Sequence, residues 1–361
     1  MKIALLNLPV DNNYGGNLQR YALMKVLQDM GHDVTHINFR VSYSPSRLRQ
    51  LVRYSKRMVS WIMGKPVDFF YEKHMRVIQQ EGERYINEFY EKYIRHTKIV
   101  YDISDIKHLN WDNYDVALVG SDQVWRYDMA QITIGIDNFF FKFLDDRIKK
   151  IAYSVSLGNY DESDIPLYQN LKDDYTRFSA VSFREEHALE YVSKIGWEKP
   201  EAEITLDPTL LLTPEDYIKN LKLSKHVSAF VFCYILDKNE MVQKIIKNIL
   251  SECGTHERIV ECGLKPNECV SIEEWLENII NSSIVITDSY HGVAFSILFN
   301  KKFFFLGNKR RGNARIDSLF RMLDLNYDNQ GFVSDFETSN RKIIELREKS
   351  INFLRNAIDE L

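Results

Sequence analysis

Residues 284–295 read IVITDSYHGVAF, and this stretch decides how the chain is organised. An apolar run ends in Asp288 and Ser289 and passes into small residues, which predicts a buried parallel strand, a tight turn and a helix. Ligands of open α/β sheets bind outside the carboxyl ends of the strands, where these two residues and His291 would lie. The helix start would favour an anion, and His291 can exchange a proton near neutral pH. Alternatively, Asp288 and Ser289 only cap the helix while His291 packs inside; this stretch alone leaves both interpretations open.

The composition is typical of a globular protein with two domains. The chain has 361 residues, more than one hydrophobic core comfortably supports, and 45% of them are hydrophobic and 27% charged. A net charge of -4 argues against a protein whose main partner is nucleic acid. The first residues are too short an apolar run for a signal peptide, and no later run could span a bilayer. We therefore expect a cytoplasmic protein.

The cysteines are expected to be reduced and structural. Cys233, Cys253, Cys262 and Cys269 form no CxxC pair, and no histidine lies near them at metal-binding spacing. The sequence therefore predicts no metal site.

Residues 3–39 predict a strand, a helix and a second strand. The turn before the helix contains Gly15, Gly16 and Asn17, where the backbone can approach a ligand closely. The glycines are adjacent and no Gly-Lys-Ser/Thr follows, so this is neither a dinucleotide fingerprint nor a phosphate loop. A tight turn that needs positive φ would explain the glycines equally well.

A basic segment, residues 46–66, opens a helical insert that we expect to cover 46–95. It carries Arg53 and Arg57 among six basic residues and no acidic one, with Trp61 among interleaved apolar residues. Such a helix can lie in a membrane interface on anionic lipid, which would bring the protein to a lipid-linked substrate. It can equally pack on its own protein, with arginine stems covering apolar surface.

Polar residues follow two strands in the middle of the chain. Ser121 and Asp122 follow a strand at 114–119, on the ligand side of a parallel sheet. Arg184 follows a strand at 181–183, where its always-charged fork suits a carboxylate or phosphate. The other interpretation of Arg184 is an ion pair with Glu185 or another helix residue.

The second half alternates strands and helices, which predicts another parallel sheet with right-handed crossovers. The strands are expected at 228–236, 257–263, 283–288 and 302–307, and the helices at 239–252, 271–282, 291–299, 314–324 and 338–361. The fold class is therefore α/β, with two Rossmann-like domains. The expected bounds are 1–205, 206–330 and a terminal helix within 331–361 that packs back on the first domain.

A basic loop follows the last predicted strand of the second sheet. It contains Lys309, Arg310 and Arg311, and Arg315 lies just after it. Beside the helix start at Ser289 it could supply positive charge to a bound anion, or it could simply be a solvated loop.

Taken together, five short blocks give the chain a family resemblance. They are residues 13–19 (NYGGNLQ), 120–125 (GSDQVW), 182–186 (SFREE), 206–209 (LDPT) and 287–292 (TDSYHG). Each is weak alone, but in this order they resemble the polysaccharide pyruvyl transferase family.

The resemblance implies a fold and a reaction. The fold would be two Rossmann-like domains facing across a cleft, as in GT-B glycosyltransferases. The reaction would transfer a pyruvyl group from phosphoenolpyruvate to a sugar of a cell-surface polysaccharide precursor, forming a cyclic ketal. Phosphoenolpyruvate is then the donor substrate, no cofactor is needed, and the partner is a saccharide acceptor, free or lipid-linked. The membrane interpretation of the basic segment adds a peripheral contact with the inner membrane.

The resemblance also assigns residues. His291 matches the family's catalytic histidine, and Arg184 matches an arginine that holds phosphoenolpyruvate. Ser289 stands where some members carry a basic residue, so a donor-phosphate contact would come from another cation: Lys309, Arg310, Arg311 or Arg315. Tyr290, in the same block, is expected among the substrate-binding residues. By their chemistry, Asp122, Asp207 and Asp288 could bind acceptor hydroxyls or orient His291.

Two other functions fit the sequence. A glycosyltransferase with the same two-domain cleft and a nucleotide-sugar donor would use the basic loop to hold a diphosphate. A non-enzymatic scaffold in a polysaccharide assembly complex would rest on the basic segment.

Overall fold

The computed structural model describes most of the chain. The described residues are 1–41, 71–158, 162–226, 229–252, 257–263, 268–307 and 314–359, with isolated positions between 54 and 69. Most of the basic segment, and Lys309, Arg310 and Arg311, lie outside them. Within the described part, no helix is both long and apolar enough to cross a membrane.

The first half of the chain forms a six-stranded sheet with the order β2-β1-β3-β4-β5-β6, and every neighbouring pair is parallel. The strands are β1 Lys2–Leu6, β2 Asp33–His36, β3 Val116–Val119, β4 Lys149–Val155, β5 Ala180–Phe183 and β6 Ala202–Ile204. The central strand β3 is buried along its whole length, as expected for apolar runs covered on both faces.

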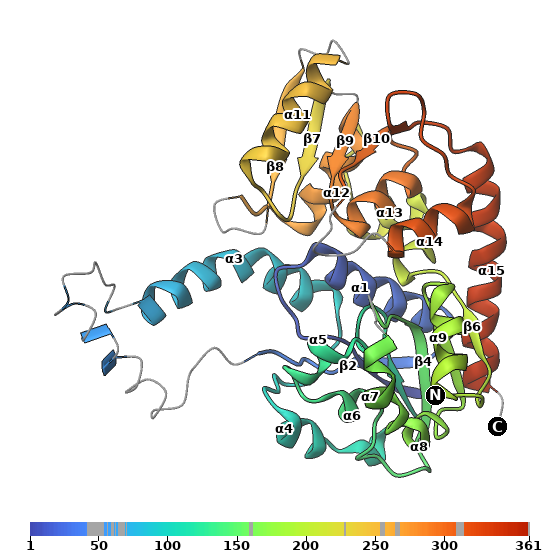
Figure 1. The fold of residues 1–361 in the computed structure, drawn as a ribbon. Helices are drawn as coiled ribbons and strands as arrows, with labels where there is room; N and C mark the ends of the chain where they lie inside the picture. Colours follow the sequence, from blue (N-terminus) through green and yellow to red (C-terminus); the bar gives the residue numbers. More distant parts are fainter. Residues whose placement is uncertain are drawn as a thin grey trace.

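Helices join these strands and cover the sheet (Figure 1). They are α1 Tyr14–Asp29, α3 Tyr71–Tyr93, α4 Ile103–Lys107, α5 Tyr127–Gln131, α6 Ile136–Phe139, α7 Ile165–Gln169, α8 Lys172–Tyr175 and α9 His187–Ile195, with short 3-10 turns η1 Trp111–Asn113 and η2 Glu162–Asp164. Helix α3 extends away from the body of the protein (Figure 1).

Helix α1 begins earlier than the sequence predicts. Asn13 is its N-cap and accepts a hydrogen bond from the Gly16 N–H, so Gly15 and Gly16 belong to its first turn. Neither glycine has positive φ, and the interpretation of a glycine-dependent turn is therefore wrong. The reason for the glycine at position 15 is a contact with the other half of the chain, described below.

The second half forms a five-stranded sheet with the order β11-β10-β9-β7-β8. The strands are β7 Phe230–Tyr234, β8 Arg258–Cys262, β9 Ile284–Thr287, β10 Phe303–Phe305 and β11 Phe332–Val333. The four predicted strands are confirmed and parallel. The edge strand β11, which the sequence did not predict, pairs antiparallel with β10 and has only two residues.

The remaining helices also confirm the predicted alternation. They are η3 Pro208–Leu210, α10 Pro214–Leu221, α11 Glu240–Glu252, α12 Ile272–Asn281, α13 Tyr290–Leu298, α14 Ala314–Leu323 and α15 Glu337–Asp359. Helix α10 starts with Pro214 in its first turn, and Thr213 and Asp216 begin it with a reciprocal capping box.

The long helix α15 runs from the second sheet back along the first (Figure 1). The Ser350 hydroxyl accepts from the Leu206 N–H at 2.9 Å, and Arg347 donates to the carbonyls of Leu210 and Leu212. The last helix therefore fastens the linker between the two sheets.

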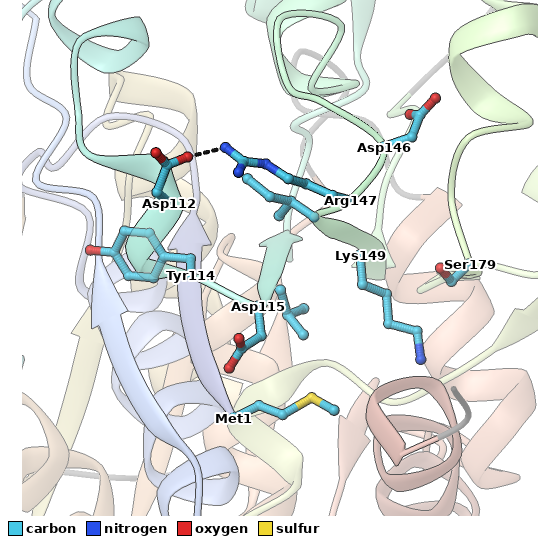
Figure 2. Close-up of a pocket in the computed structure, with 10 residues that line it drawn as sticks. Met1, Asp112, Tyr114, Asp115, Asp146, Arg147, Lys149 and Ser179 are labelled. Atoms are coloured by element: carbon cyan, nitrogen blue, oxygen red, sulfur yellow. Dashed lines mark hydrogen bonds and ion pairs between the residues drawn. The ribbon is translucent and has the colours of Figure 1, made fainter.

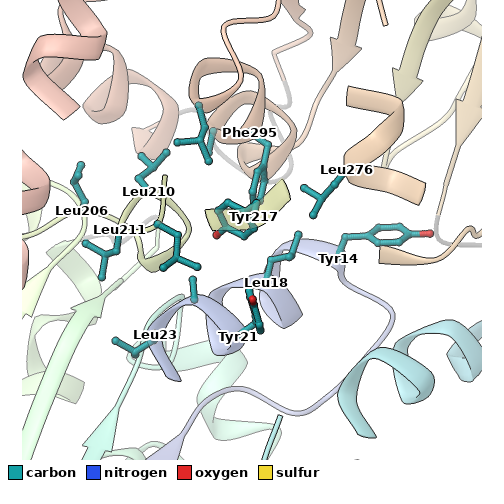
Figure 3. Close-up of a cluster of buried hydrophobic side chains, with 14 of the residues drawn as sticks. Tyr14, Leu18, Tyr21, Leu23, Leu206, Leu210, Leu211, Tyr217, Leu276 and Phe295 are labelled. Carbon is teal, nitrogen blue, oxygen red and sulfur yellow. The ribbon is translucent and has the colours of Figure 1, made fainter. Parts of the chain in front are cut away.

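One hydrophobic cluster joins the two halves (Figure 3). Tyr14 of α1 stacks on Trp275 of α12, with ring centroids 5.4 Å apart, and Tyr217 of α10 meets Phe295 of α13 edge to face at 5.2 Å. Because these large rings are buried, the cluster holds the first turn of α1 against the start of α13.

Candidate active site

The turn between β9 and α13 is built largely by capping. The Ser289 hydroxyl accepts from the Gly292 N–H at 3.4 Å, and the Thr287 hydroxyl accepts from the Ser289 N–H at 3.1 Å. Asp288 accepts from the backbone N–H groups of Leu236 at 2.7 Å and Asp237 at 3.1 Å, which fixes the loop after β7. Ser289 thus caps α13, as the capping interpretation predicts, whereas Asp288 holds the loop after β7; both residues also line a pocket.

His291, in the first turn of α13, is 5% exposed. Its Nε2 is buried, has no hydrogen-bond partner among the described residues, and lies 3.9 Å from Asp207 Oδ2. A buried polar atom without a partner costs about 1–3 kcal/mol, so such an atom is expected where a ligand or a reaction requires it. The sequence interpretation in which His291 only packs in the core does not explain this atom.

Gly15 of α1 provides the space for His291. A Cβ atom at Gly15 would lie 1.9 Å from His291 Nδ1, whereas one at Gly16 would meet nothing closer than 3.8 Å. The two adjacent glycines therefore have different tasks. Only Gly15 touches the site, and Gly16 contributes an N–H to the cap at Asn13.

Arg184 is held by carboxylates rather than left open. Its Nη1 donates to Asp207 Oδ2 at 2.7 Å and its Nη2 to Asp122 Oδ1 at 2.9 Å, and its side chain is only 1% exposed. Glu185 Oε2 lies 3.8 Å from its Nε, so the predicted Glu185 pair exists but is the longest of the three. Arg184 therefore organises the site in this structure, and two of the predicted substrate-binding carboxylates are its partners.

Arg315 is the more accessible arginine of the site. Its side chain is 15% exposed, and its Nη1 lies 3.5 Å from Asp122 Oδ1. Both Arg315 and Arg184 lie over the ring of Tyr290, with centroid distances of 5.7 and 4.6 Å. Two guanidinium groups thus lie against one aromatic ring, an arrangement that cation–π attraction favours.

The charges of the site shift its protonation states. Burial lowers the pKa of the His291 imidazole from 6.5 to about 4, although Asp207 and Asp122 oppose this. Burial alone would raise the pKa of the Asp122 carboxyl, but Arg184 and Arg315 outweigh it and lower the pKa to about 2. At neutral pH the imidazole is therefore neutral while the carboxylates and guanidinium groups are charged.

A small pocket of about 50 Å³ opens between the two sheets at this point. Its lining comes from both halves of the chain: Asn13, Asp122, Leu236, Asp288, Ser289, Tyr290, His291, Phe305, Arg315 and Ile316. A larger pocket lies at the amino-terminal edge of the first sheet, between Met1, Asp115 and Lys149 (Figure 2). Parallel sheets bind ligands at the other edge, so the pocket at His291 is the candidate active site.

Some predicted site residues lie outside the pocket lining. Asn17 is fully buried, donates to the carbonyls of Asp11 and Asn13, and accepts from Arg20. Ser121 is buried, and its hydroxyl has no hydrogen-bond partner in the described part of the chain. Arg311 falls outside the described residues.

Sequence reasoning missed two polar residues of the site. Gln19 donates to Asp207 Oδ2 at 2.6 Å. Gln19 stands inside one of the blocks that carry the family resemblance, which was the available signal. Asn13 lines the pocket and is also within such a block.

No metal cluster occurs among the described residues: no group of three or more His, Cys, Asp and Glu side chains is suitably placed. Cys233, Cys262 and Cys269 are free thiols.

Comparison with known proteins gives one family. A sequence model of the family described as polysaccharide pyruvyl transferase matches residues 13–310. No curated protein matches the chain.

Comparison with solved structures gives distant similarities. The UDP-GlcNAc 2-epimerase of Methanocaldococcus jannaschii, in complex with UDP-GlcNAc and UDP, has 12% identity and a TM-score of 0.47, covering 96% of this chain and 100% of that one. The UDP-GlcNAc 2-epimerase of Neisseria meningitidis has 12% identity and a TM-score of 0.46, with 99% and 94% covered. An uncharacterized protein of Klebsiella pneumoniae has 13% identity and a TM-score of 0.37, with 67% and 82% covered.

Proposed function

The chain belongs to the polysaccharide pyruvyl transferase family, and from this we propose that it transfers a pyruvyl group from phosphoenolpyruvate to a sugar of a cell-surface polysaccharide precursor. The product is a cyclic ketal on two hydroxyls of the sugar. The observation that supports this proposal most is His291, a buried neutral imidazole with an unpartnered nitrogen, in a pocket that also presents Arg315.

The donor is an anion with a carboxylate and a phosphate, and the pocket offers three positive features. Arg315 is the cation that lines the pocket, and the first turns of α1 and α13 meet where Gly15 approaches His291. Backbone N–H groups and the partial positive charge at helix starts favour anions. We assign the donor to these groups, with Arg184 as the support that keeps the surrounding carboxylates in place.

The chemistry requires proton transfer at carbon. A proton is added to the methylene carbon of the enol, so the carbon that bears phosphate becomes electrophilic. The first sugar hydroxyl adds there, phosphate departs, and the second hydroxyl closes the ketal. Of the two hydroxyl protons released, one balances the proton gained by the methyl group and the other leaves on phosphate. His291 is the group that moves these protons, a task that contributes about 10²–10⁴-fold in rate.

The donor itself can bring His291 into the acidic form. In the free protein burial lowers the imidazole pKa to about 4. Two anionic groups placed beside the ring would raise this pKa, because an opposite charge favours the protonated imidazole. Donor binding would then be accompanied by proton uptake, which supplies the proton for the methylene carbon.

Asp122 is the best candidate for binding the acceptor. Its Oδ1 is paired with Arg184 and Arg315, while no hydrogen bond within the described chain reaches its Oδ2, and the residue lines the pocket. A carboxylate oxygen in this position can accept a hydrogen bond from a sugar hydroxyl.

Thermal unfolding with different donors tests the proposal. Phosphoenolpyruvate should raise the unfolding temperature, and the shift should diminish in Arg315→Ala. Stabilisation by a uridine or cytidine nucleotide, with none by phosphoenolpyruvate, would contradict the proposal and favour a nucleotide-sugar glycosyltransferase. Release of phosphate from phosphoenolpyruvate with methyl galactoside or methyl mannoside should be lost in His291→Ala, and an unchanged rate in this variant would contradict the role of the histidine.

The lipid linkage of the acceptor and the contact of the basic segment with a membrane remain predictions from the sequence.

A further inference from the structure

Tyr290 lies where the two positive side chains of the site meet. It is the first residue of α13 and is only 7% exposed, although it lines the pocket. The guanidinium carbon of Arg184 lies 4.6 Å from the centre of its ring, and that of Arg315 lies 5.7 Å from it. Burial raises the pKa of the Tyr290 hydroxyl, so the ring is that of a neutral phenol. Both cations are therefore within range of a cation–π attraction to one ring.

The two guanidinium groups repel each other. Arg184 Nη2 and Arg315 Nη1 both approach Asp122 Oδ1, at 2.9 and 3.5 Å. Two positive charges this close, in a site largely closed to water, cost free energy unless other groups compensate. The Asp122 carboxylate and the Tyr290 ring contact both cations and so offset this repulsion.

Arg184 and Arg315 are not held equally well. Arg184 also donates to Asp207 Oδ2 at 2.7 Å, and its side chain is 1% exposed. Arg315 has the longer contact with Asp122, and its side chain is 15% exposed. It is also the second residue of α14, where the partial positive charge of a helix start disfavours a cation. The position of Arg315 therefore depends more on the ring than that of Arg184 does.

The geometry points to Tyr290 as a positioning residue, whose ring holds the Arg315 guanidinium at the pocket, where it meets an anionic group of the substrate. An arginine side chain is long and flexible, so one without such a contact samples many conformations. Only the molecules with Arg315 in place bind the anion at full strength, and the ring raises their fraction. That the anion is phosphoenolpyruvate rests on the proposed function, whereas the contact between ring and guanidinium does not.

An anion at this place also explains why a cation occupies an unfavourable position. A carboxylate or phosphate beside Arg315 would be attracted by its guanidinium, by the charge of Arg184 and by the start of α14. The repulsion between the two arginines in the free protein is then balanced by the charge of the ligand.

Nuclear Overhauser contacts in the free protein test the placement without a ligand. The chain has 20 tyrosines, so the ring signals of Tyr290 would be assigned by their absence in Tyr290→Phe, and those of Arg315 by their absence in Arg315→Ala. We expect contacts between the Tyr290 ring protons and the Arg315 side chain. Their absence would overturn the inference.

Two variants of Tyr290 separate the ring from the hydroxyl. Tyr290→Phe and Tyr290→Leu both remove the hydroxyl, but only Tyr290→Leu removes the ring. Measured by calorimetry, the dissociation constant for phosphoenolpyruvate should rise about 5–30-fold in Tyr290→Leu and stay within about twofold in Tyr290→Phe. An equal loss in both would show that the hydroxyl binds the substrate and would overturn the inference. If Tyr290→Leu does not fold, a loss in Tyr290→Phe still has this meaning.

A double variant shows whether the ring acts through Arg315. Because Arg315→Ala already removes the guanidinium, adding Tyr290→Leu to it should weaken phosphoenolpyruvate binding by no more than about twofold. A further loss of about 5–30-fold would mean that the ring acts by another route, and the inference would fail.

The inference and the proposed function can fail independently. Inorganic phosphate that binds with the same pattern among the variants, while phosphoenolpyruvate does not bind, would refute the proposed function alone. Pyruvyl transfer by a protein whose affinity for phosphoenolpyruvate is unchanged in Tyr290→Leu would refute this inference alone.

Discussion

A methyl group added at Gly15 would lie 1.9 Å from His291 Nδ1 and 2.1 Å from Cγ. Ordinary contacts of a Cβ atom are 3.4–4 Å long, so the ring or the first turn of α1 would have to move by about 1.5 Å or more. Gly15→Ala therefore displaces the imidazole from the position described here.

The expected effect on the rate is large and that on stability is small. A displacement of about 1 Å in a catalytic group can cost about 100-fold, so kcat should fall by at least about 100-fold. Overpacking costs about 1–3 kcal/mol, while replacing a glycine inside a helix by alanine stabilises by about 0.5–1 kcal/mol. The net loss of unfolding free energy should thus be about 0–2.5 kcal/mol.

The adjacent glycine provides a matched control. Gly16→Ala adds the same methyl group in the same helical turn, but its nearest neighbour would be Arg20 Nη1 at 3.8 Å. We expect an activity close to that of the unaltered protein and a gain of up to about 1 kcal/mol in unfolding free energy.

Both variants should be assayed for phosphate release from phosphoenolpyruvate with a saccharide acceptor, and for unfolding in urea. If the kcat of Gly15→Ala stays within about threefold of that of Gly16→Ala, the position of the His291 ring against α1 is not required for catalysis.

Four further predictions concern the charges. The unaltered protein should lose up to about 3 kcal/mol of unfolding free energy between pH 6.5 and about 4, because the imidazole pKa is lowered in the folded state and the unfolded state therefore binds more protons as the pH drops. His291→Asn should lack this loss. Identical curves of unfolding free energy against pH for the two proteins, measured with urea, would contradict this. Arg315→Ala should weaken phosphoenolpyruvate binding about 10–100-fold by calorimetry, since a hydrogen bond to a charged group contributes about 1.5–3 kcal/mol; unchanged affinity would place the donor elsewhere. Arg184→Met should lower the unfolding free energy by about 3–5 kcal/mol because it removes the buried cation that pairs with both Asp207 and Asp122, and a loss below about 1 kcal/mol would argue against this network. Cosedimentation with anionic liposomes should weaken with salt and with charge reversal at Arg53 and Arg57, whereas salt-independent binding or none would exclude the membrane role of the basic segment.

The alternating strands and helices could be predicted because most of the strands are continuous apolar runs. Such a run is formed by residues adjacent in the chain, so it can be recognised in the sequence itself. The strands at 283–288 and 302–307 are present with small differences at their ends. The predicted start of α1 was wrong because adjacent glycines are typical of a turn. Gly15 is instead required by its close contact with the ring of His291, a residue distant in sequence. The two-residue strand β11 is too short to carry a pattern.

The candidate site was predicted in its position but not in its pairings. The sequence predicted that Asp122, Arg184 and His291 lie at the carboxyl ends of strands. In the structure the three residues lie close together there. That Arg184 would pair with two carboxylates, and that Gln19 would hold one of them, depends on contacts across the fold. No spacing rule along the chain could have shown these contacts.

Mass analysis of a saccharide acceptor after incubation with phosphoenolpyruvate decides whether this protein attaches a pyruvyl group to a sugar. Phosphate is measured in the same sample, and His291→Ala serves as the control. We expect a pyruvyl ketal formed in equal amount to the phosphate released, and its loss in the variant. An acceptor that gains a sugar from a nucleotide donor but never a pyruvyl group would contradict it.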